Sequence, residues 1–172
     1  MKIGIVSDTH GRLDPRVVEV VSGCDWIVHA GDVGDAGLLK TLADAGGKLA
    51  AVRGNNDIPS KWPAGQAAAL EALPESVELD LPGGTLAVVH GHRQGAAKVR
   101  HRNLRRAFPA ARAVVYGHSH RLVIDDETSP WIINPGAAGR ARTYGGPSCI
   151  MLDAGANQWL LRVHRFPLEK QG

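Results

Sequence analysis

Val6-Ser7-Asp8-Thr9-His10-Gly11 sets a carboxylate and an imidazole two residues apart, directly after a short apolar run. That run, residues 2–7, is rich in β-branched residues, and the polar cluster 8–11 ends it. We therefore predict a buried strand that delivers Asp8 and His10 onto a loop. An Asp-x-His pair alone is common by chance, so its meaning depends on the rest of the chain.

Four later runs repeat this arrangement of a strand followed directly by polar groups. We predict strands over residues 25–30, 49–52, 85–89 and 113–116. They are followed by Gly31-Asp32, Gly54-Asn55-Asn56-Asp57, His90-Gly91-His92 and Gly117-His118-Ser119-His120. Because ligands bind at the carboxyl ends of strands in open α/β sheets, we expect the five loops to converge.

The segments between the first strands are typical of helices. Asp14-Pro15 resembles a helix cap and first turn, and Gly46-Gly47 follows a run with helical spacing, so strands and helices alternate as in a parallel sheet. Pro82-Gly83-Gly84 then separates two strand-like runs, which predicts an antiparallel hairpin that joins this sheet. Residues 95–108 predict a basic amphipathic helix. Strands near 122–124, 131–133, 148–152 and 159–163 complete an α/β sandwich.

The bulk composition predicts one globular domain over residues 1–172, since 44% of the residues are hydrophobic and 22% are charged. The net charge of +3 is too mild to indicate a nucleic-acid-binding protein. Cys24 and Cys149 lack the spacing of a disulfide framework, so we expect reduced, at least partly buried thiols. With neither a secretory leader pattern nor a membrane-spanning apolar run in the sequence, we expect a cytoplasmic protein without a membrane partner.

The polar groups at the strand ends offer oxygen and imidazole nitrogen to a metal ion, with no thiolate. Such a mixture suits Mn, Fe, Co, Ni or Zn better than Ca or Mg, and we take manganese as the first choice. The set is too large for one tetrahedral site and about right for two divalent ions that share one carboxylate. The candidate metal ligands are Asp8, His10, Asp32, Asn55, His90, His118 and His120.

These blocks, in this order, resemble the calcineurin-like metallophosphoesterase superfamily. The family pattern is Asp-x-His, Gly-Asp, Gly-Asn-x-Asp/Glu, a lone His, and Gly-His-x-His, and all five blocks occur here. The small size, His90-Gly91-His92 and Asn134-Pro135-Gly136 resemble its compact bacterial and archaeal phosphodiesterases of the YfcE type. The resemblance implies a four-layer α/β/β/α sandwich of two mixed sheets flanked by helices.

The resemblance also implies a role for each candidate ligand. Asp8, His10 and His120 would hold a first metal ion, Asn55, His90 and His118 a second, and Asp32 would bridge them. Two such ions can acidify a bridging water and stabilise an in-line displacement. We therefore expect a metal-dependent phosphoric ester hydrolase whose nucleophile is a metal-bridging hydroxide, with Ser7 and Ser119 as spacers or hydrogen-bond donors.

One residue departs from the phosphomonoesterase branch of the family. That branch has a histidine able to protonate the leaving group where this chain has Asn56, whose amide is not an acid at neutral pH. We expect a phosphodiesterase with weak phosphomonoesterase activity, acting on small diesters such as aryl diesters or 2′,3′-cyclic nucleotides. Asp57 is expected to orient Asn56 or a nearby loop. His92 is an alternative proton donor, although a role limited to hydrogen bonding is equally open.

Two other functions fit the same features. The fold also serves as a non-catalytic binding scaffold in a retromer subunit, whose metal site is incomplete. The basic segment from Lys98 to Arg106 could make the protein a nuclease that contacts a phosphate backbone, but no aromatic residues are interleaved to stack bases, which favours a solvated helix face. The family resemblance also allows a homo-oligomer.

The remaining polar residues match no block. His29, His101 and His164 are interpreted as structural or surface residues, and Asp14, Asp25 and Asp35 as caps or turns. Asn134-Pro135-Gly136 either closes the site beside the loop after residue 116 or forms a plain turn. The loops Ile58 to Leu73 and Gly139 to Pro147 are expected to shape the pocket.

Overall fold

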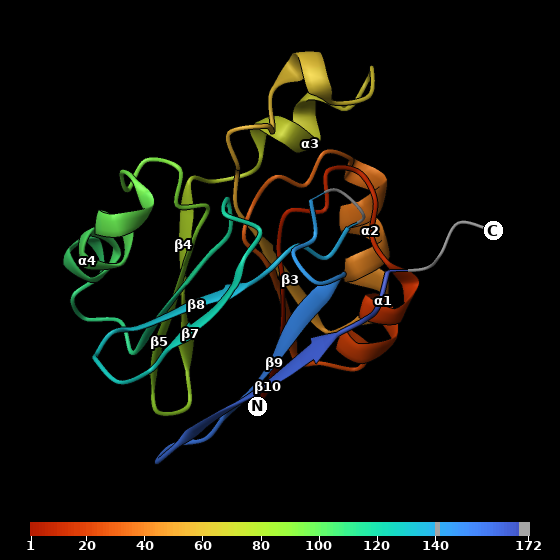
Figure 1. Ribbon diagram of the computed structural model, residues 1–172. Coiled ribbons are helices and arrows are strands. Elements are labelled where there is room, and N and C mark those ends of the chain that lie inside the picture. The colour runs from red at the N-terminus through yellow and green to blue at the C-terminus, as the bar shows by residue number, and fades with distance from the viewer. Residues whose placement is uncertain (140–141, 169–172) are drawn as a thin grey trace.

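Two five-stranded sheets pack face to face in the computed structural model, which describes residues 1–139 and 142–168 (Figure 1). The first sheet has the order β10-β9-β1-β2-β3 and comprises β1 (Lys2–Val6), β2 (Trp26–His29), β3 (Lys48–Ala51), β9 (Ser148–Ala154) and β10 (Trp159–Arg165). The second has the order β4-β5-β6-β8-β7 and comprises β4 (Ser76–Leu81), β5 (Gly84–Val89), β6 (Ala113–Tyr116), β7 (Leu122–Asp125) and β8 (Trp131–Pro135). Both sheets combine parallel and antiparallel pairs.

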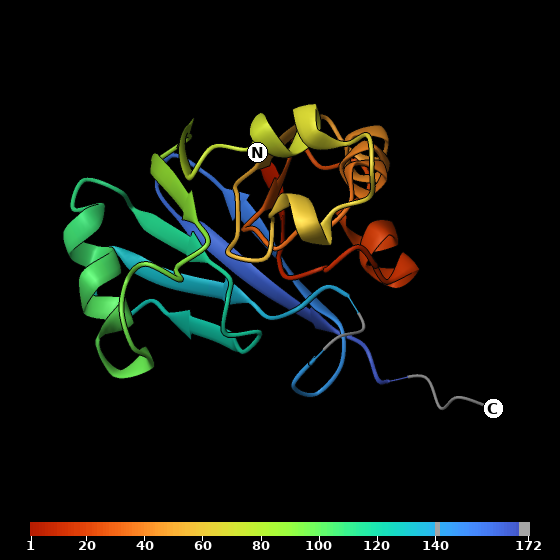
Figure 2. The same ribbon diagram turned by 90° about the horizontal axis from the view of Figure 1, so that it is seen from above.

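Helices cover the outer face of each sheet. The outer helices are α1 (Pro15–Val21), α2 (Ala36–Ala45), α3 (Ala67–Glu71) and α4 (Ala97–Ala107), and a 3-10 turn, η1, spans Pro59–Lys61. Val17, Leu42 and Leu70 pack α1, α2 and α3 in one apolar cluster with Ile27 of the first sheet. Leu104 packs α4 on the second sheet, on the far side of the molecule (Figure 2).

The central core lies between the two sheets. Ile3 and Val28 of the first sheet contribute to the same buried cluster as Leu86, Val115 and Ile133 of the second. Strands whose faces are both covered bury nearly continuous apolar runs, as β1 and β6 do. The predicted four-layer α/β/β/α sandwich is confirmed.

The local signals at the helix ends have the expected form. The Asp14 carboxylate caps α1 by accepting from the Arg16 N–H, with Pro15 at the first helical position, and Asp35 caps α2 in the same way. Asp25 instead accepts a hydrogen bond from the Lys2 N–H, which ties the start of β2 to β1. The predicted caps at Asp14 and Asp35 are confirmed.

The hairpin was expected in the wrong sheet. β4 and β5 pair antiparallel as predicted, but β5 continues into β6, so the hairpin belongs to the second sheet. The antiparallel strand of the first sheet is β9, which pairs with β1 on one side and with β10 on the other. A turn signal fixes the pairing of its own two strands only, whereas the choice of sheet depends on contacts distant in sequence.

Two further expectations have outcomes in the fold. Cys24 and Cys149 are both free and buried, as predicted. In the described part of the chain, none of the helices has the length and apolarity needed to cross a membrane.

Candidate metal centre

The loops after five strands meet at one edge of the two sheets. β1, β2 and β3 run parallel in the first sheet, and β5 and β6 run parallel in the second, so their carboxyl ends lie together. The structure brings all seven candidate ligands together at this edge, in two adjoining groups.

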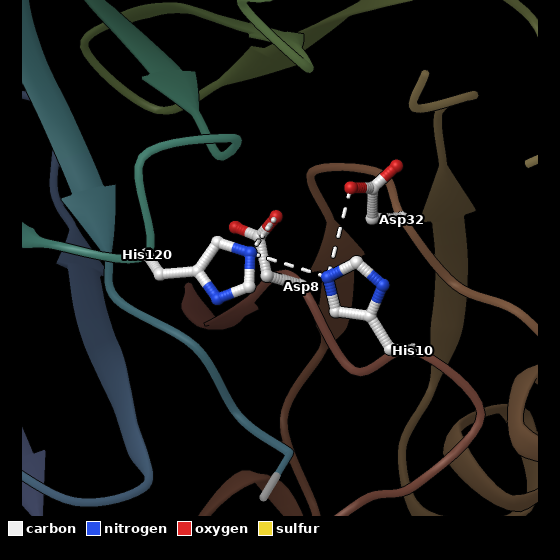
Figure 3. A group of neighbouring side chains, drawn as sticks. All are labelled: Asp8, His10, Asp32 and His120. Atoms are coloured by element: carbon white, nitrogen blue, oxygen red, sulfur yellow. Dashed lines mark hydrogen bonds and ion pairs between the residues drawn. The ribbon is translucent and has the colours of Figure 1, made fainter. Parts of the chain in front are cut away.

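The first group joins residues from three of these loops. Asp8, His10, Asp32 and His120 each place a potential ligand atom within 4.8 Å of those of the others (Figure 3). His10 Nε2 lies 3.2 Å from His120 Nε2 and 3.7 Å from Asp32 Oδ2, and His120 Nε2 lies 3.4 Å from Asp8 Oδ1. Imidazole and carboxylate lone pairs that converge in this way can hold a divalent cation.

The second group adjoins the first through Asp32. Asn55 Oδ1 lies 3.1 Å from His90 Nε2 and 3.0 Å from His118 Nδ1. His90 Nδ1 lies 2.8 Å from the Ala30 carbonyl, which it can contact only as a donor, so its Nε2 is directed at the centre. Asp32 Oδ2 is 3.4 Å from that Nε2, so one carboxylate is within reach of both groups.

The backbone at these positions is held in an unusual conformation. Left-handed φ angles are rare outside glycine, and six such residues occur in the described chain. Five of them are candidate ligands: Asp8 (53°), His10 (47°), Asp32 (56°), His118 (65°) and His120 (56°). Strain of this kind persists where the surrounding structure over-determines it, and it concentrates at functional sites.

The glycines in the sequence blocks are explained by close packing. A Cβ at Gly54 would overlap Asp32 Oδ1, and a Cβ at Gly117 would overlap the Ser7 hydroxyl. Ser7 Oγ in turn donates to Asp8 Oδ2 at 2.9 Å. Each glycine therefore lets one strand-end loop approach the carboxylate of another.

Asp57 binds the loops around the centre to one another. Its buried carboxylate accepts from the backbone N–H groups of Val33, Gly34 and Gly54 at 2.8 to 3.2 Å, and from Trp62 Nε1 at 2.9 Å. The loops after β2 and β3 and the segment after η1 are thus joined at one side chain. These contacts correspond to the loop-orienting role considered for Asp57.

Asn56 is fixed on Asp32 by two hydrogen bonds. Its backbone N–H donates to Asp32 Oδ1, and its Nδ2 donates to Asp32 Oδ2, both at 2.7 Å. Its Oδ1 accepts from the Lys61 ammonium. Because the lysine can only donate, it sets the orientation of the Asn56 amide.

A second network, unforeseen from the sequence, supports the Asp8 loop. His29 is fully buried, and its Nδ1 accepts from the Gly31 N–H while its Nε2 lies 2.8 Å from Thr9 Oγ1. Thr9 Oγ1 also donates to the Val33 carbonyl. Burial lowers the pKa of His29 to about 4, so the ring is neutral and joins the loops after β1 and β2.

The pKa values of the two carboxylates at the centre are shifted in opposite directions. Burial raises the pKa of Asp8 to about 7, against a lowering effect of the nearby His90 ring. Burial also acts to raise the pKa of Asp32, but hydrogen bonds from His90 and Asn56 outweigh it and hold the pKa well below its usual range. A buried carboxylate beside another is costly to ionise unless a cation lies between them.

The histidine rings suit metal ligation. Burial lowers the pKa of His118 to about 4 and also lowers that of His10. For His90, burial acts to lower the pKa, but the hydrogen bond and charge of Asp32 raise it overall. His10 and His118 are thus neutral near pH 7, the form that binds metal ions.

His92 lies beside the second group. Its ring centroid is 5.4 Å from that of His90 and 6.3 Å from that of His118. Its buried Nδ1 has no hydrogen-bond partner among residues 1–139 and 142–168. Of the three candidate catalytic residues, Asn56 contacts Asp32, Asp57 contacts the backbone of the loops beside it, and His92 lies beside the two histidines.

Asn134 supports the loop that carries His118 and His120. Its buried Nδ2 donates to the Gly117 carbonyl at 2.8 Å and to Ser119 Oγ, while its Oδ1 accepts from the Gly136 N–H. The two interpretations of Asn134-Pro135-Gly136 thus both apply, since the turn also holds the loop.

A pocket of about 280 Å³ opens onto the first group, and sequence reasoning missed two of its residues. Lys61 and Arg142 line it together with His10, Asp32, Gly34, Asn56 and Asp57. They belong to the two loops expected to shape the pocket, of which residues 140 and 141 lie outside the described part. The sequence offered no signal for them beyond that expectation.

The basic helix, α4, lies on the outer face of the second sheet, and some of its basic side chains form contacts within the protein. Arg105 forms an ion pair with Asp125 at 2.7 Å, and Arg100 donates to the Gly95 carbonyl. His101 contacts Tyr116 Oη and Asp125, which agrees with its interpretation as structural. The exposed cations of the segment are Lys98, Arg102 and Arg106.

Several known proteins are similar to this chain in sequence or in fold. A "probable metallophosphoesterase" of Methanocaldococcus jannaschii is 31% identical over 146 residues, which cover 80% of this chain and 68% of that protein. A phosphodiesterase of the same organism is 24% identical over 150 residues, covering 79% and 83%. YfcE, a phosphoesterase from E. coli, is 28% identical with a TM-score of 0.64, covering 89% of this chain and 88% of that one.

A fourth comparison concerns the fold alone. Vps29 of Chaetomium thermophilum has a TM-score of 0.79 over 95% of this chain and 88% of its own, at 16% identity. The model of the calcineurin-like phosphoesterase superfamily domain matches residues 1–157. The resemblance drawn from the five blocks is confirmed: this chain belongs to the calcineurin-like phosphoesterase superfamily, and its enzyme class is that of the metal-dependent phosphoric ester hydrolases.

Proposed function

We propose that this chain, acting as one domain over residues 1–172, hydrolyses phosphodiester bonds with two divalent metal ions. The observation that carries the proposal is the position of Asp32, whose Oδ2 is 3.7 Å from His10 Nε2 and 3.4 Å from His90 Nε2. Asp8, His10 and His120 would hold one ion, Asn55, His90 and His118 the other, and Asp32 both. A phosphodiesterase among its relatives supports the reaction type.

The residues present fit such ions. All donors are carboxylate or amide oxygens and imidazole nitrogens, a set that accepts Mn, Ni, Co, Fe or Zn, with Mn as our first choice. The buried Asp8 carboxyl, with its pKa raised to about 7 by burial, gains most from a cation beside it. Five strained ligand positions support a preorganised site.

The chain supplies positioning, and the ions would supply the chemistry. Two divalent ions, when bound, acidify a water and stabilise the charge of an in-line displacement at phosphorus. Asn56 holds Asp32 through two hydrogen bonds, and Asp57 holds the loops on either side. Ser7 Oγ donates to Asp8, and Ser119 Oγ accepts from Asn134, so both hydroxyls stabilise the loops that carry the ligands and are not assigned to the substrate.

The Asn56 side chain predicts which esters react. The side-chain NH2 group and oxygen of Asn56 both have hydrogen-bond partners, and the amide has no acidic proton, so Asn56 cannot protonate a poor leaving group. We expect kcat/KM for bis(4-nitrophenyl) phosphate, whose leaving group needs no proton, to exceed that for an alkyl phosphomonoester such as glycerol 1-phosphate, whose leaving group does, by about tenfold or more, a difference of about 1.4 kcal/mol. Steady-state assays with Mn²⁺ measure both, and a clear preference for the monoester contradicts the proposal.

His92 is proposed as the donor to poor leaving groups. If it protonates the leaving oxygen, His92→Asn lowers kcat/KM by about 10²-fold for alkyl-leaving diesters and far less for 4-nitrophenyl esters, whose leaving group needs no proton. If it only hydrogen-bonds, both classes fall equally. A series of diesters with graded leaving-group acidity measures the difference, and an unchanged slope refutes the donor role.

A further inference from the structure

Two cations stand at the ends of the row of side chains that crosses the pocket. Lys61, at the end of η1, donates to Asn56, and Asn56 donates to Asp32. Beyond Asp32 the contacts continue through His10 to His120, whose Nε2 lies 3.2 Å from Arg142 Nη2. Lys61 and Arg142 come from two loops far apart in sequence, and both side chains are exposed at the pocket.

In the described part of the chain, neither cation is paired with a carboxylate. Other arginines pair with carboxylates, as Arg105 does with Asp125 and Arg93 with Glu75. Within residues 1–139 and 142–168, no ion pair joins Lys61 or Arg142 to an acidic side chain. Two cations left without counter-charges beside a concave site attract an anion.

Arg142 has an unusual backbone conformation, and its guanidinium contacts a nitrogen atom that a metal ion would occupy. Its φ of 52° makes it the sixth described non-glycine residue in the left-handed region, and the other five are candidate ligands. Its present acceptor is His120 Nε2, the same lone pair that would bind a metal ion. A metal ion on that lone pair would remove this acceptor from the guanidinium and repel it, which would leave the guanidinium able to bind an anion.

The charge of the pocket exceeds what a simple diester supplies. Asp8, Asp32 and Asp57 bring three negative charges, against four from two divalent ions and two from Lys61 and Arg142. An attacking hydroxide and the single charge of a phosphodiester still leave the site about one charge positive. The pocket has a volume of about 280 Å³, near the lower end of ligand sites at about 300 Å³.

We propose that Lys61 and Arg142 form a binding site for a second phosphate group, so that the preferred substrates are phosphodiesters carrying a further phosphate. Arginine offers a fork of donors and lysine a point charge, and both bind phosphate. The inference rests on the proposed diesterase function, which it narrows to a substrate class.

The test compares two esters that differ by one phosphate. The substrates are the 4-nitrophenyl ester of thymidine 5′-phosphate and the same ester phosphorylated on the 3′ oxygen. In the wild type the second phosphate is expected to raise kcat/KM about tenfold or more, and Lys61→Met and Arg142→Met each to reduce that ratio to about 3 or less. Arg102→Met, an exposed cation on α4, is the matched control and should keep the ratio. An equal ratio in all four proteins overturns the proposal.

Binding provides a readout that does not need turnover. Calorimetry on the Mn²⁺-loaded protein should show thymidine 3′,5′-bisphosphate binding about tenfold more tightly than thymidine 5′-phosphate, with the preference lost in both methionine variants. If that preference appears while no diester is hydrolysed, the proposed function fails and the phosphate site stands. If diesters are hydrolysed without any preference for the second phosphate, the site fails and the function stands.

Discussion

Asp32→Asn is expected to lower kcat/KM for an aryl phosphodiester by about 10³-fold or more, a loss of about 4 kcal/mol in transition-state stabilisation. The shape of the side chain is kept, but the charge that faces His10 and His90 is lost. In the variant, the side-chain NH2 group that replaces one carboxylate oxygen would also face an N–H donor of Asn56, because Asn56 donates to both Asp32 oxygens. Both halves of the centre therefore lose a ligand at once.

Steady-state kinetics with saturating Mn²⁺ measure this loss. Asp44→Asn is the matched control, because Asp44 is exposed on α2 and forms an ion pair with Lys40 one turn away. It should leave kcat/KM within about twofold of the wild type, as exposed ion pairs contribute little. If an Asp32→Asn protein folds and retains more than a tenth of the activity, Asp32 is not a ligand shared by both metal ions.

Asp57→Ala is expected to lower the free energy of unfolding of the metal-free protein by about 3 to 5 kcal/mol. The substitution leaves three backbone N–H groups and the Trp62 indole N–H without their acceptor in a buried place. Asp57→Asn should cost less, because one oxygen can still accept from two of these donors. Urea unfolding in the presence of a chelator measures both values without interference from metal binding.

A control variant and a measurement of activity distinguish a structural role of Asp57 from a direct role in catalysis. Asp44→Ala should change the unfolding free energy by less than about 0.5 kcal/mol. If Asp57→Ala proved as stable as the wild type but inactive, Asp57 would act on the substrate directly and its loop contacts would be incidental. A loss of stability with activity falling in parallel would assign it to the framework of the centre.

Much of the centre could be predicted because its signals are local. A β-branched run followed by Asp8 and His10 identifies a strand and its end, and the same reading applies at Asp32, Asn55 and His90. Parallel strands then bring their carboxyl ends to one edge without any knowledge of the loops. Asp14 and Asp35 were equally readable, since a helix cap depends on a few neighbouring residues.

What could not be predicted depends on contacts between distant segments. The hairpin of β4 and β5 joins the second sheet because β5 pairs with β6, a strand more than twenty residues further along the chain. Lys61 and Arg142 stand on irregular loops, whose paths follow from packing rather than from a repeating pattern. His29 looked like any unassigned histidine, and its role depends on a threonine twenty residues away.

The most direct test of the two-metal mechanism measures bis(4-nitrophenyl) phosphate hydrolysis by chelator-treated protein before and after Mn²⁺ is added, with bound metal counted in the same samples. The two-metal mechanism predicts that hydrolysis is lost on chelation, returns as about two ions bind per chain, and does not return in Asp32→Asn. Hydrolysis that survives both chelation and the substitution would contradict it. So would a chain that binds no metal ion and hydrolyses no ester, the behaviour expected of a binding scaffold.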